Sequence, residues 1–377
     1  MSIQIFSHFD GGNIEVIDAA DPAAVKLAIQ PDAGDEHLQW FYFQVCDARD
    51  QDCVLSIDNA GKVSFPEGFE GYQAVCSIDQ EHWFRVPTEF DGDRLTIRHT
   101  PPADVVYYAY FAPYTLARHQ ALIADALNSP QVRAESLCAT PDGHAHTLLI
   151  IGEEAAPGAK KLWITARQHP GETMAEWWVE GFLGRLLDAD DPVARRLLEQ
   201  AVIYLVPNMC IDGAVRGHLR TNALGRNLNR EWADPSADAS PEVFYVIEKM
   251  KETGVDFAFD VHGDEALPYN FIAGAEGTES WNDHKQIQLD EFKSLLASIS
   301  PDFQTEFGYE VDPPKSSDMK KCTDYVAETF DCLSMTLEMP FKDSAITPNE
   351  EFGWSAGRCQ ALGMACVDAF WHSLPKL

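Results

Sequence analysis

Two histidines and two glutamates follow apolar runs of the chain, and a catalytic zinc site is built from these residue types. They are His169 and Glu172 after residues 162–166, His262 after residues 257–261, and Glu338 after residues 333–337. Such runs are typical of buried strands in an α/β protein, where ligands gather outside the carboxyl ends of the strands. Two histidines and a glutamate brought together there make a His₂Glu zinc site with one position left for water. We therefore expect one Zn²⁺ per chain on His169, Glu172 and His262, with Glu338 as the base acting on that water.

The segment between the first two of these residues is suited to reversing the chain. Pro170 disfavours a helical backbone at His169 and so ends the strand there. Gly171 permits a sharp turn, which leaves Glu172 at or near the start of the next helix. Two ligands three residues apart on such a turn can reach the same metal ion.

Each of these residues also has an ordinary explanation. A carboxylate such as Glu172 at the start of a helix is stabilised by the helix dipole, and a histidine on an apolar strand, such as His262, is commonly a hydrogen-bonded core residue. Glu338 differs, because a carboxylate that ends a buried strand is costly without a partner. Asp260 either orients a metal ligand or is a buried structural acid. The coincidence at three strand ends favours the metal site.

A second group of functional candidates is a set of arginines in a segment rich in Asn and Gly. The set comprises Arg216, Arg220, Arg226 and Arg230. The planar guanidinium group suits carboxylate recognition. A charged run of this kind is usually a solvated surface loop. Because cationic residues are scarce elsewhere in this chain, we favour a functional role.

Charge and cysteine content exclude several classes of function. The 377 residues carry 60 acidic and 28 basic side chains, a net charge of −32, which repels nucleic acid and anionic membrane surfaces. We therefore expect neither as a partner. The nine cysteines lack C-x-x-C spacing and indicate reduced thiols rather than disulfides or a cysteine zinc site. The absence of a signal-like N-terminus or a long apolar stretch favours a cytoplasmic protein. No oligomeric state is predicted.

The pattern of predicted secondary structure changes near residue 115, which predicts two domains. Short β-rich runs at 40–45, 54–57, 83–86 and 95–98 alternate with turn residues in the first part. This spacing is typical of a small antiparallel β-sandwich, which we place at residues 1–114. In residues 115–377, strands at 147–151, 162–166, 202–206, 257–261 and 335–337 alternate with helices at 116–128, 174–187, 241–253 and 290–298. This alternation predicts an α/β domain with a mainly parallel sheet covered by helices on both faces.

Several short motifs resemble those of one enzyme family. They are His-Pro-Gly-Glu at 169–172, Gly-Arg-Asn-Leu-Asn-Arg at 225–230, Thr-Leu-Glu at 336–338, Tyr-Phe-Ala-Pro-Tyr-Thr at 110–115 and Pro-Asn-Met-Cys-Ile-Asp-Gly at 207–213. In this order the chain resembles zinc metallocarboxypeptidases of the carboxypeptidase A clan, and within them the cytosolic carboxypeptidase-like branch with its bacterial members. The resemblance covers about residues 100 to 377, and the β-rich first part resembles that branch's N-terminal domain. It implies a mainly parallel, mixed sheet between helices.

The resemblance also implies an activity and a role for each motif residue. The activity is zinc-dependent removal of one amino acid from the C-terminus of a peptide or protein. The implied zinc ligands are His169, Glu172 and His262, with Glu338 as general base and then general acid. By the same resemblance, Arg220 holds the developing oxyanion, while Asn229 and Arg230 bind the terminal carboxylate of the substrate.

The chain departs from the family pattern at three places. His144 stands where much of the family has an outer substrate-binding arginine. The family's mobile tyrosine has two candidates, Tyr309 and Tyr325. Members that remove glutamate have a basic residue some fifteen positions before the catalytic glutamate; here that position is near Thr323, beside Lys320 and Lys321. A preference for glutamate is therefore not implied.

Two other functions fit parts of the pattern. A zinc amidohydrolase that deacylates small N-acyl amino acids would share the metal ligands and the arginine grip. A non-enzymatic binding protein would use zinc for structure and the β-domain to recruit a partner. The presence of Glu338 together with Asn229 and Arg230 argues against the binding protein.

Overall fold

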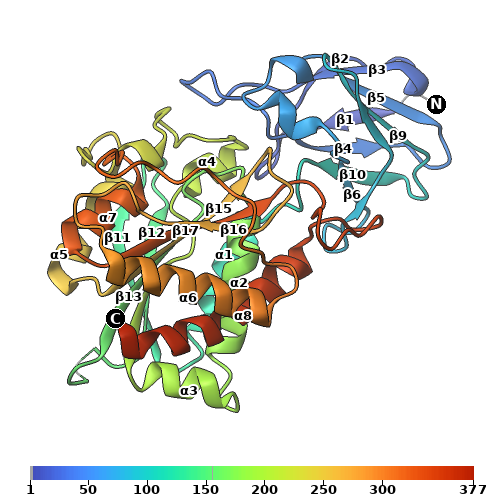
Figure 1. Ribbon diagram of the computed structural model, residues 1–377. Coiled ribbons are helices and arrows are strands. Elements are labelled where there is room, and N and C mark those ends of the chain that lie inside the picture. The colour runs from blue at the N-terminus through green and yellow to red at the C-terminus, as the bar shows by residue number, and fades with distance from the viewer. Residues whose placement is uncertain (1–2, 155) are drawn as a thin grey trace.

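The computed structural model describes residues 3–154 and 156–377. The N-terminal part of the chain, up to strand β10, is built from short strands (Figure 1). Within these residues, two five-stranded sheets have the orders β1-β4-β10-β6-β7 and β2-β3-β5-β9-β8. The strands are β1 Gln4–Phe6, β2 Glu15–Asp18, β3 Val25–Ala28, β4 Tyr42–Cys46, β5 Cys53–Ile57, β6 Val75–Ser77, β7 Phe84–Arg85, β8 Thr88–Phe90, β9 Leu95–His99 and β10 Val105–Ala109. Their pairs are antiparallel except β3–β5. Alternate residues of β5 are buried, as expected where two sheets pack face to face.

The second part contains a seven-stranded sheet within the described residues, in the order β11-β12-β14-β13-β15-β17-β16. Its strands are β11 Val132–Ala139, β12 Ala145–Ile151, β13 Lys160–Ala166, β14 Ala201–Val206, β15 Phe257–Asp264, β16 Phe271–Ala273 and β17 Leu333–Pro340. The central strands β14, β13, β15 and β17 are parallel. The outer pairs are antiparallel. The expected mixed α/β sheet is therefore confirmed.

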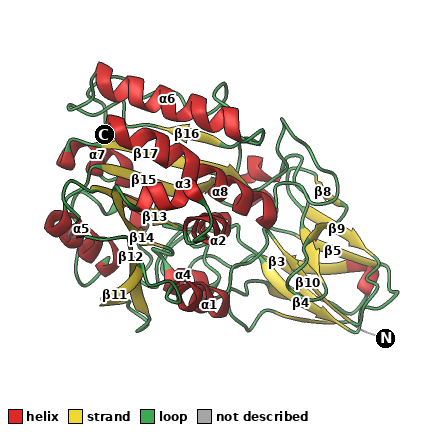
Figure 2. Cartoon of the chain, turned by 90° about the horizontal axis from the view of Figure 1, so that it is seen from below, coloured by secondary structure: helices red, strands yellow, loops and turns green. Residues whose placement is uncertain are grey.

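Helices cover both faces of this sheet (Figure 2). The helices are α1 Leu116–Ala126, α2 Met174–Leu186, α3 Pro192–Leu198, α4 Ile211–Arg216, α5 Pro241–Thr253, α6 Asp283–Ile299, α7 Cys322–Phe330 and α8 Ala356–Ser373, with 3₁₀ turns η1 Pro22–Ala24, η2 Ala60–Lys62, η3 Pro66–Phe69, η4 Leu228–Arg230 and η5 Leu374–Lys376. Helices α2, α6 and α8 bury their apolar sides in one hydrophobic cluster, and α5 and α7 bury theirs in a second. Strands β13 and β15 contribute residues to both clusters, as an internal strand must.

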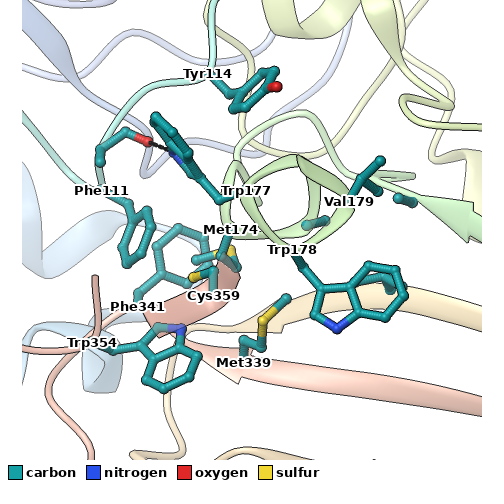
Figure 3. Packing of buried hydrophobic residues seen from close by; sticks show 14 of the residues in the cluster. Phe111, Tyr114, Met174, Trp177, Trp178, Val179, Met339, Phe341, Trp354 and Cys359 are labelled. Carbon is teal, nitrogen blue, oxygen red and sulfur yellow. Dashed lines mark hydrogen bonds between the residues drawn. The ribbon is translucent and has the colours of Figure 1, made fainter. Parts of the chain in front are cut away.

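The two parts of the chain share a continuous apolar junction. Tyr110, just after β10, stacks on Phe341 with ring centroids 4.4 Å apart, and Phe111 meets Phe341 edge-on. Figure 3 shows Phe111 beside the α2 residue Trp177, with Phe341 below them and Trp354 beyond Phe341. The indole Nε1 of Trp177 donates to the carbonyl oxygen of Ala112 at 2.9 Å. The boundary between residues 114 and 115 stays a prediction. None of the described helices combines the length and apolar character needed to cross a bilayer.

His146 on β12 should make the free energy of unfolding depend on pH, which provides a test of the packing around it. The side chain is fully buried and neither ring nitrogen has a hydrogen-bond partner among the described residues. Burial, helped by nearby His119, lowers the pKa of His146 to about 3. Between about pH 6.5 and pH 3, His146 is therefore protonated in the unfolded chain but neutral in the folded chain. The free energy of unfolding falls with decreasing pH there, by about 1.4 kcal/mol per pH unit from this residue.

The variant His146→Leu is expected to lose that contribution. Urea unfolding between pH 6 and pH 4 should give a shallower dependence of the unfolding free energy on pH than in the parent. The exposed residue His284 supplies the control, because His284→Leu should leave the slope unchanged. Equal slopes for His146→Leu and the parent would contradict a buried neutral histidine.

Candidate active site

The turn after β13 and the strand β15 bring three potential metal ligands together. His169 Nδ1 lies 2.6 Å from Glu172 Oε1, and His262 Nδ1 lies 2.8 Å from Glu172 Oε2. One ligand atom from each residue falls within 4.8 Å of the others. All three side chains are buried. The expected convergence of His169, Glu172 and His262 is therefore present in the fold.

The donor set of this cluster fits Zn²⁺. Imidazole nitrogens and a carboxylate are ordinary zinc ligands, and three of them leave a position open. Burial and the charge of Arg220 lower the pKa of His169 to about 4, which keeps its imidazole neutral and free to coordinate. Burial raises the pKa of Glu172, but its close contacts with His169 and His262 outweigh this effect and keep the carboxylate ionised. Burial lowers the pKa of His262, but the carboxylates of Asp260 and Glu172 outweigh burial and raise it well above the ordinary value, so metal binding there displaces a proton.

Each imidazole is held from its other nitrogen. Nε2 of His262 lies 2.8 Å from Asp260 Oδ2, and Nε2 of His169 lies 3.1 Å from Asn227 Oδ1. Such contacts fix the ring orientation and the tautomer of a metal-binding histidine. Asp260 thus contacts a candidate ligand, one of the two alternatives left open for it. Asn227 was not predicted, although it lies within the Gly-Arg-Asn-Leu-Asn-Arg motif.

Asp260 is itself part of a buried polar chain. Its carboxylate accepts hydrogen bonds from Thr165 Oγ1 at 2.7 Å and from Gln168 Nε2 at 2.5 Å. The Gln168 side-chain oxygen in turn accepts from the indole Nε1 of Trp232 at 2.8 Å. Gln168 was missed in the sequence, where its only signal is a polar residue at the end of an apolar run.

Glu338 lies beside His262 on the neighbouring strand. The parallel register pairs His262 of β15 with Glu338 of β17, and each strand continues three residues further than the predicted ends. Glu338 is 7% exposed, and its Oε2 has no hydrogen-bond partner among the described residues. Burial and the nearby carboxylates Glu172 and Asp264 raise the pKa of Glu338 well above its ordinary value. A buried carboxylate with an unused oxygen is suited to take a proton from a water molecule.

A cleft of about 310 Å³ is lined by His169, His262 and Glu338, together with the candidate substrate-binding side chains. Arg220, Asn229, Arg230, Tyr309, Thr323 and Lys321 are among its lining residues. Asn229, in η4, accepts a hydrogen bond on Oδ1 from the backbone N–H of Cys322 at 2.8 Å, which leaves its Nδ2 donor available to a ligand. Within the described part of the chain, no carboxylate pairs with the guanidinium group of Arg220 or Arg230. Both guanidinium groups are therefore available to a ligand, although the lining also includes carboxylates.

The other two arginines of the predicted set have structural partners. Arg216 binds Asp142 through Nη2 at 2.7 Å, and Arg226 lies 3.8 Å from Glu231. Neither lines the cleft. His144, which we predicted to stand at the position of the family's outer arginine, also lies outside the cleft lining, with Nδ1 2.7 Å from Asp212 Oδ1.

The structure distinguishes the two tyrosines that the sequence left open. The hydroxyl group of Tyr309 donates to Asp264 Oδ2 at 2.6 Å and lies 3.3 Å from Glu338 Oε1. Half of the Tyr309 surface is exposed at the cleft. Tyr325 instead packs on Trp232 in the hydrophobic cluster under α5 and α7. Of the two tyrosines, Tyr309 is therefore the one that lines the cleft.

Thr323 also lines the cleft, and its hydroxyl oxygen lies 2.6 Å from that of Thr336. Lys321 lines the cleft, whereas Lys320 does not.

Residues 167–172, which carry two of the candidate ligands and which we call the metal turn, are held in place by contacts of the backbone and of Arg167. Arg167 has a left-handed backbone with φ of 56°, and its side chain binds the Pro170 carbonyl at 2.9 Å and Glu176 at 2.5 Å. Gly171 lies in the turn, as expected, and its backbone is not left-handed. It is needed for close approach, because a Cβ atom there would lie 2.9 Å from the Leu219 carbonyl oxygen. The metal turn thus packs directly on the loop that carries Arg220.

Comparison with known proteins assigns both parts of the chain to described families. Residues 5–111 match the model of the cytosolic carboxypeptidase N-terminal domain, and residues 121–353 match that of zinc carboxypeptidase. The solved structure of a putative carboxypeptidase A from Shewanella denitrificans is 49% identical, with a TM-score of 0.97 and 99% of each chain covered.

Two further relatives extend this similarity. A metallo-carboxypeptidase from Pseudomonas aeruginosa, solved in complex with (2-guanidinoethylmercapto)succinic acid, is 41% identical, with a TM-score of 0.96 and 99% of each chain covered. Cytosolic carboxypeptidase 6 of Caenorhabditis elegans is 26% identical over 88% of this chain and 77% of its own.

Proposed function

Because this chain belongs to the zinc carboxypeptidase family, we propose that it removes single amino acids from the C-termini of peptides or proteins. The family is one of peptide hydrolases, which makes the chain an enzyme and disfavours both a purely structural zinc protein and a deacylase of small N-acyl amino acids. The observation that carries the proposal is the buried, unpartnered Oε2 of Glu338 beside the His₂Glu cluster. Arg220 and Arg230 in the same cleft, which have no ion pair among the described residues, supply a site for a terminal carboxylate.

His169, Glu172 and His262 are the proposed zinc ligands. Zinc bound there supplies Lewis-acid activation of a water molecule at neutral pH. Asp260 and Asn227 keep the two imidazoles in the orientation and tautomer that coordination requires.

Glu338 is the proposed proton carrier. Its unpartnered Oε2 accepts a proton from the attacking water, and the same carboxyl group later delivers a proton to the leaving amine. The hydroxyl group of Tyr309, 3.3 Å from the other oxygen of Glu338, orients the carboxylate and covers the substrate side of the cleft.

Arg220 and Arg230 have different proposed roles, one at the scissile carbonyl and one at the terminal carboxylate. Arg220 stabilises the oxygen that becomes negative when water attacks the scissile carbonyl, a contribution of about 3–4 kcal/mol by analogy with oxyanion-hole donors. Arg230 and the Nδ2 group of Asn229 bind the terminal carboxylate and so limit cleavage to the last peptide bond.

The direct test is mass spectrometry on a peptide library with varied C-terminal residues, with and without a chelator. We expect stepwise loss of single residues from the C-terminus, and no loss once the metal is removed. Internal cleavage, or hydrolysis of N-acetyl amino acids in place of peptides, would contradict the proposal.

The carboxylate grip gives a separate prediction. Arg230→Ala should raise KM for peptides with a free C-terminus by about 10-fold or more, because a charge-assisted hydrogen bond contributes about 1.5–3 kcal/mol. Steady-state kinetics measure this effect, with Arg226→Ala as the control because Arg226 lies outside the cleft. If the parent enzyme cleaves amidated and free peptides equally well, the carboxylate grip is wrong.

A further inference from the structure

The loop that carries Arg220 lies against the N-terminal β-domain. The side-chain Nδ2 of Asn13 donates to the carbonyl oxygen of Gly217 at 2.9 Å. The backbone N–H of Ala33 donates to Nε2 of His218 at 3.0 Å. Gly217 also packs so closely on the backbone of Gly12 that a Cβ atom would lie 2.6 Å from the Gly12 carbonyl oxygen. Two residues of the N-terminal domain, Asp32 and Phe65, contact Arg220 itself.

Asp32 of the N-terminal domain binds the backbone on both sides of Arg220. Its Oδ1 accepts from the N–H of Leu219 at 2.6 Å, and its Oδ2 accepts from the N–H of Arg220 at 2.8 Å and of Thr221 at 2.9 Å. The Thr221 hydroxyl adds a fourth hydrogen bond at 3.0 Å. Asp32 is only 2% exposed. Successive backbone N–H groups turned toward one anion form a rigid nest, so a buried carboxylate in it fixes the conformation of the loop.

Phe65 of the N-terminal domain supports the side chain of Arg220. The guanidinium carbon lies 5.4 Å from the centre of the Phe65 ring, within the range of a cation–π contact. The ring is itself held, because the buried Gln39 amide donates to the Phe65 carbonyl at 2.9 Å and accepts from the Phe65 N–H at 2.9 Å. Among the described residues, the Arg220 guanidinium has no hydrogen bond or ion pair that would replace this support.

The same loop is linked to the metal turn. The backbone N–H of Gly171 donates to the carbonyl oxygen of Leu219 at 2.9 Å. A shift of residues 219–221 would therefore move Arg220 relative to His169 and Glu172. A displacement of about 1 Å is enough to cost about 100-fold in rate where a catalytic geometry is strict.

We propose that Asp32 is a positioning residue for Arg220, with Phe65 as its partner, so that the N-terminal domain is a structural part of the active site. The proposal rests on the role of Arg220 in the proposed function. It assigns to the first domain a task in catalysis, in addition to its packing on the second domain.

Asp10 provides a matched control for a simple role in joining the domains. Its Oδ2 accepts from the backbone N–H of Leu116 at 2.6 Å, at the start of α1. It is also an N-terminal-domain carboxylate that binds a backbone N–H of the second domain, but it does not contact the Arg220 loop. Asp10→Asn should leave kcat/KM within about twofold of the parent, as expected for a change away from the reacting groups.

The experiment is a double-mutant cycle on the zinc-loaded full chain with a peptide substrate. Asp32→Asn should lower kcat/KM by about 10- to 100-fold through kcat, and Arg220→Ala by about 100- to 1,000-fold. The double variant should be no slower than Arg220→Ala alone, because Asp32 acts through Arg220. Parent-like kinetics of Asp32→Asn, or additive losses in the double variant, would overturn the proposal.

Hydrogen exchange separates this inference from the proposed function. Amide exchange in peptides spanning residues 218–222 should be faster in Asp32→Asn and unchanged in Asp10→Asn, whatever the substrate. A parent without carboxypeptidase activity would refute the proposed function alone, whereas unchanged exchange in Asp32→Asn would refute the positioning role. If Asp32→Asn fails to fold, Phe65→Leu replaces it: an approximately 3- to 30-fold loss in kcat/KM that vanishes in the Arg220→Ala background supports the proposal, and its absence overturns it.

Discussion

Replacing Glu338 with glutamine is expected to lower kcat by about 10²- to 10⁴-fold, the usual contribution of a general acid–base group. The amide keeps the size of the side chain but cannot accept a proton from water or deliver one to the leaving amine. The three candidate metal ligands are untouched, so zinc content should equal that of the parent. KM should change little, because the carboxylate grip of Asn229 and Arg230 is separate from Glu338.

Steady-state kinetics together with metal analysis check this result. Glu310→Gln is the matched control, since Glu310 also lines the cleft but is exposed and is not one of the candidate metal ligands. Parent-like turnover in Glu338→Gln would refute the role of Glu338. Loss of zinc in that variant would instead show that the carboxylate holds the metal.

Metal removal is the second large effect. Treatment with a chelator should reduce peptide hydrolysis to background, and added Zn²⁺ should restore it, because His169, Glu172 and His262 form the described cluster suited to a divalent ion. Glu172→Gln should prevent the restoration, since it removes the one negative ligand of the set. Hydrolysis that survives complete metal depletion would contradict a metallopeptidase.

Calorimetry gives a readout of this site that does not depend on turnover. A ligand that binds only the folded chain stabilises it, by about 4 kcal/mol at a free concentration 1,000 times Kd. Zinc should therefore raise the Tm of the metal-free parent and of Glu310→Gln, but not that of Glu172→Gln. An equal shift in all three proteins would place the ion elsewhere.

The sheet could be predicted because its strands are buried on both faces. Residues 162–166 and 257–261 are mostly apolar, with one polar residue each, and both lie within parallel strands of the structure. The edge strand β11 was missed, because most of its residues are partly or fully exposed and it carries no such run. Helix α6 begins at Asp283 rather than at residue 290, because Asn282 caps it by accepting from the N–H groups of His284 and Lys285.

The site was predictable where chemistry is encoded in short motifs. His169, Glu172, His262 and Glu338 each follow an apolar run, and parallel pairing brings the ends of those runs together. The contacts of Gln168 and Asn227 depend on side chains far away in the sequence, so no local pattern reveals them. The choice of Tyr309 over Tyr325 and the contact of Asp32 with the Arg220 loop depend in the same way on how distant segments pack.

The unpaired guanidinium groups of Arg220 and Arg230 have a consequence for how substrates arrive. At long range, the net charge of −32 repels an anionic peptide; the Debye length, about 10 Å at 0.1 M salt, sets how far that repulsion reaches. Inside the cleft, the two cations attract the same peptide with little intervening solvent. Rising ionic strength therefore speeds the encounter by screening the long-range repulsion, while it weakens the contacts of the bound complex to a smaller extent.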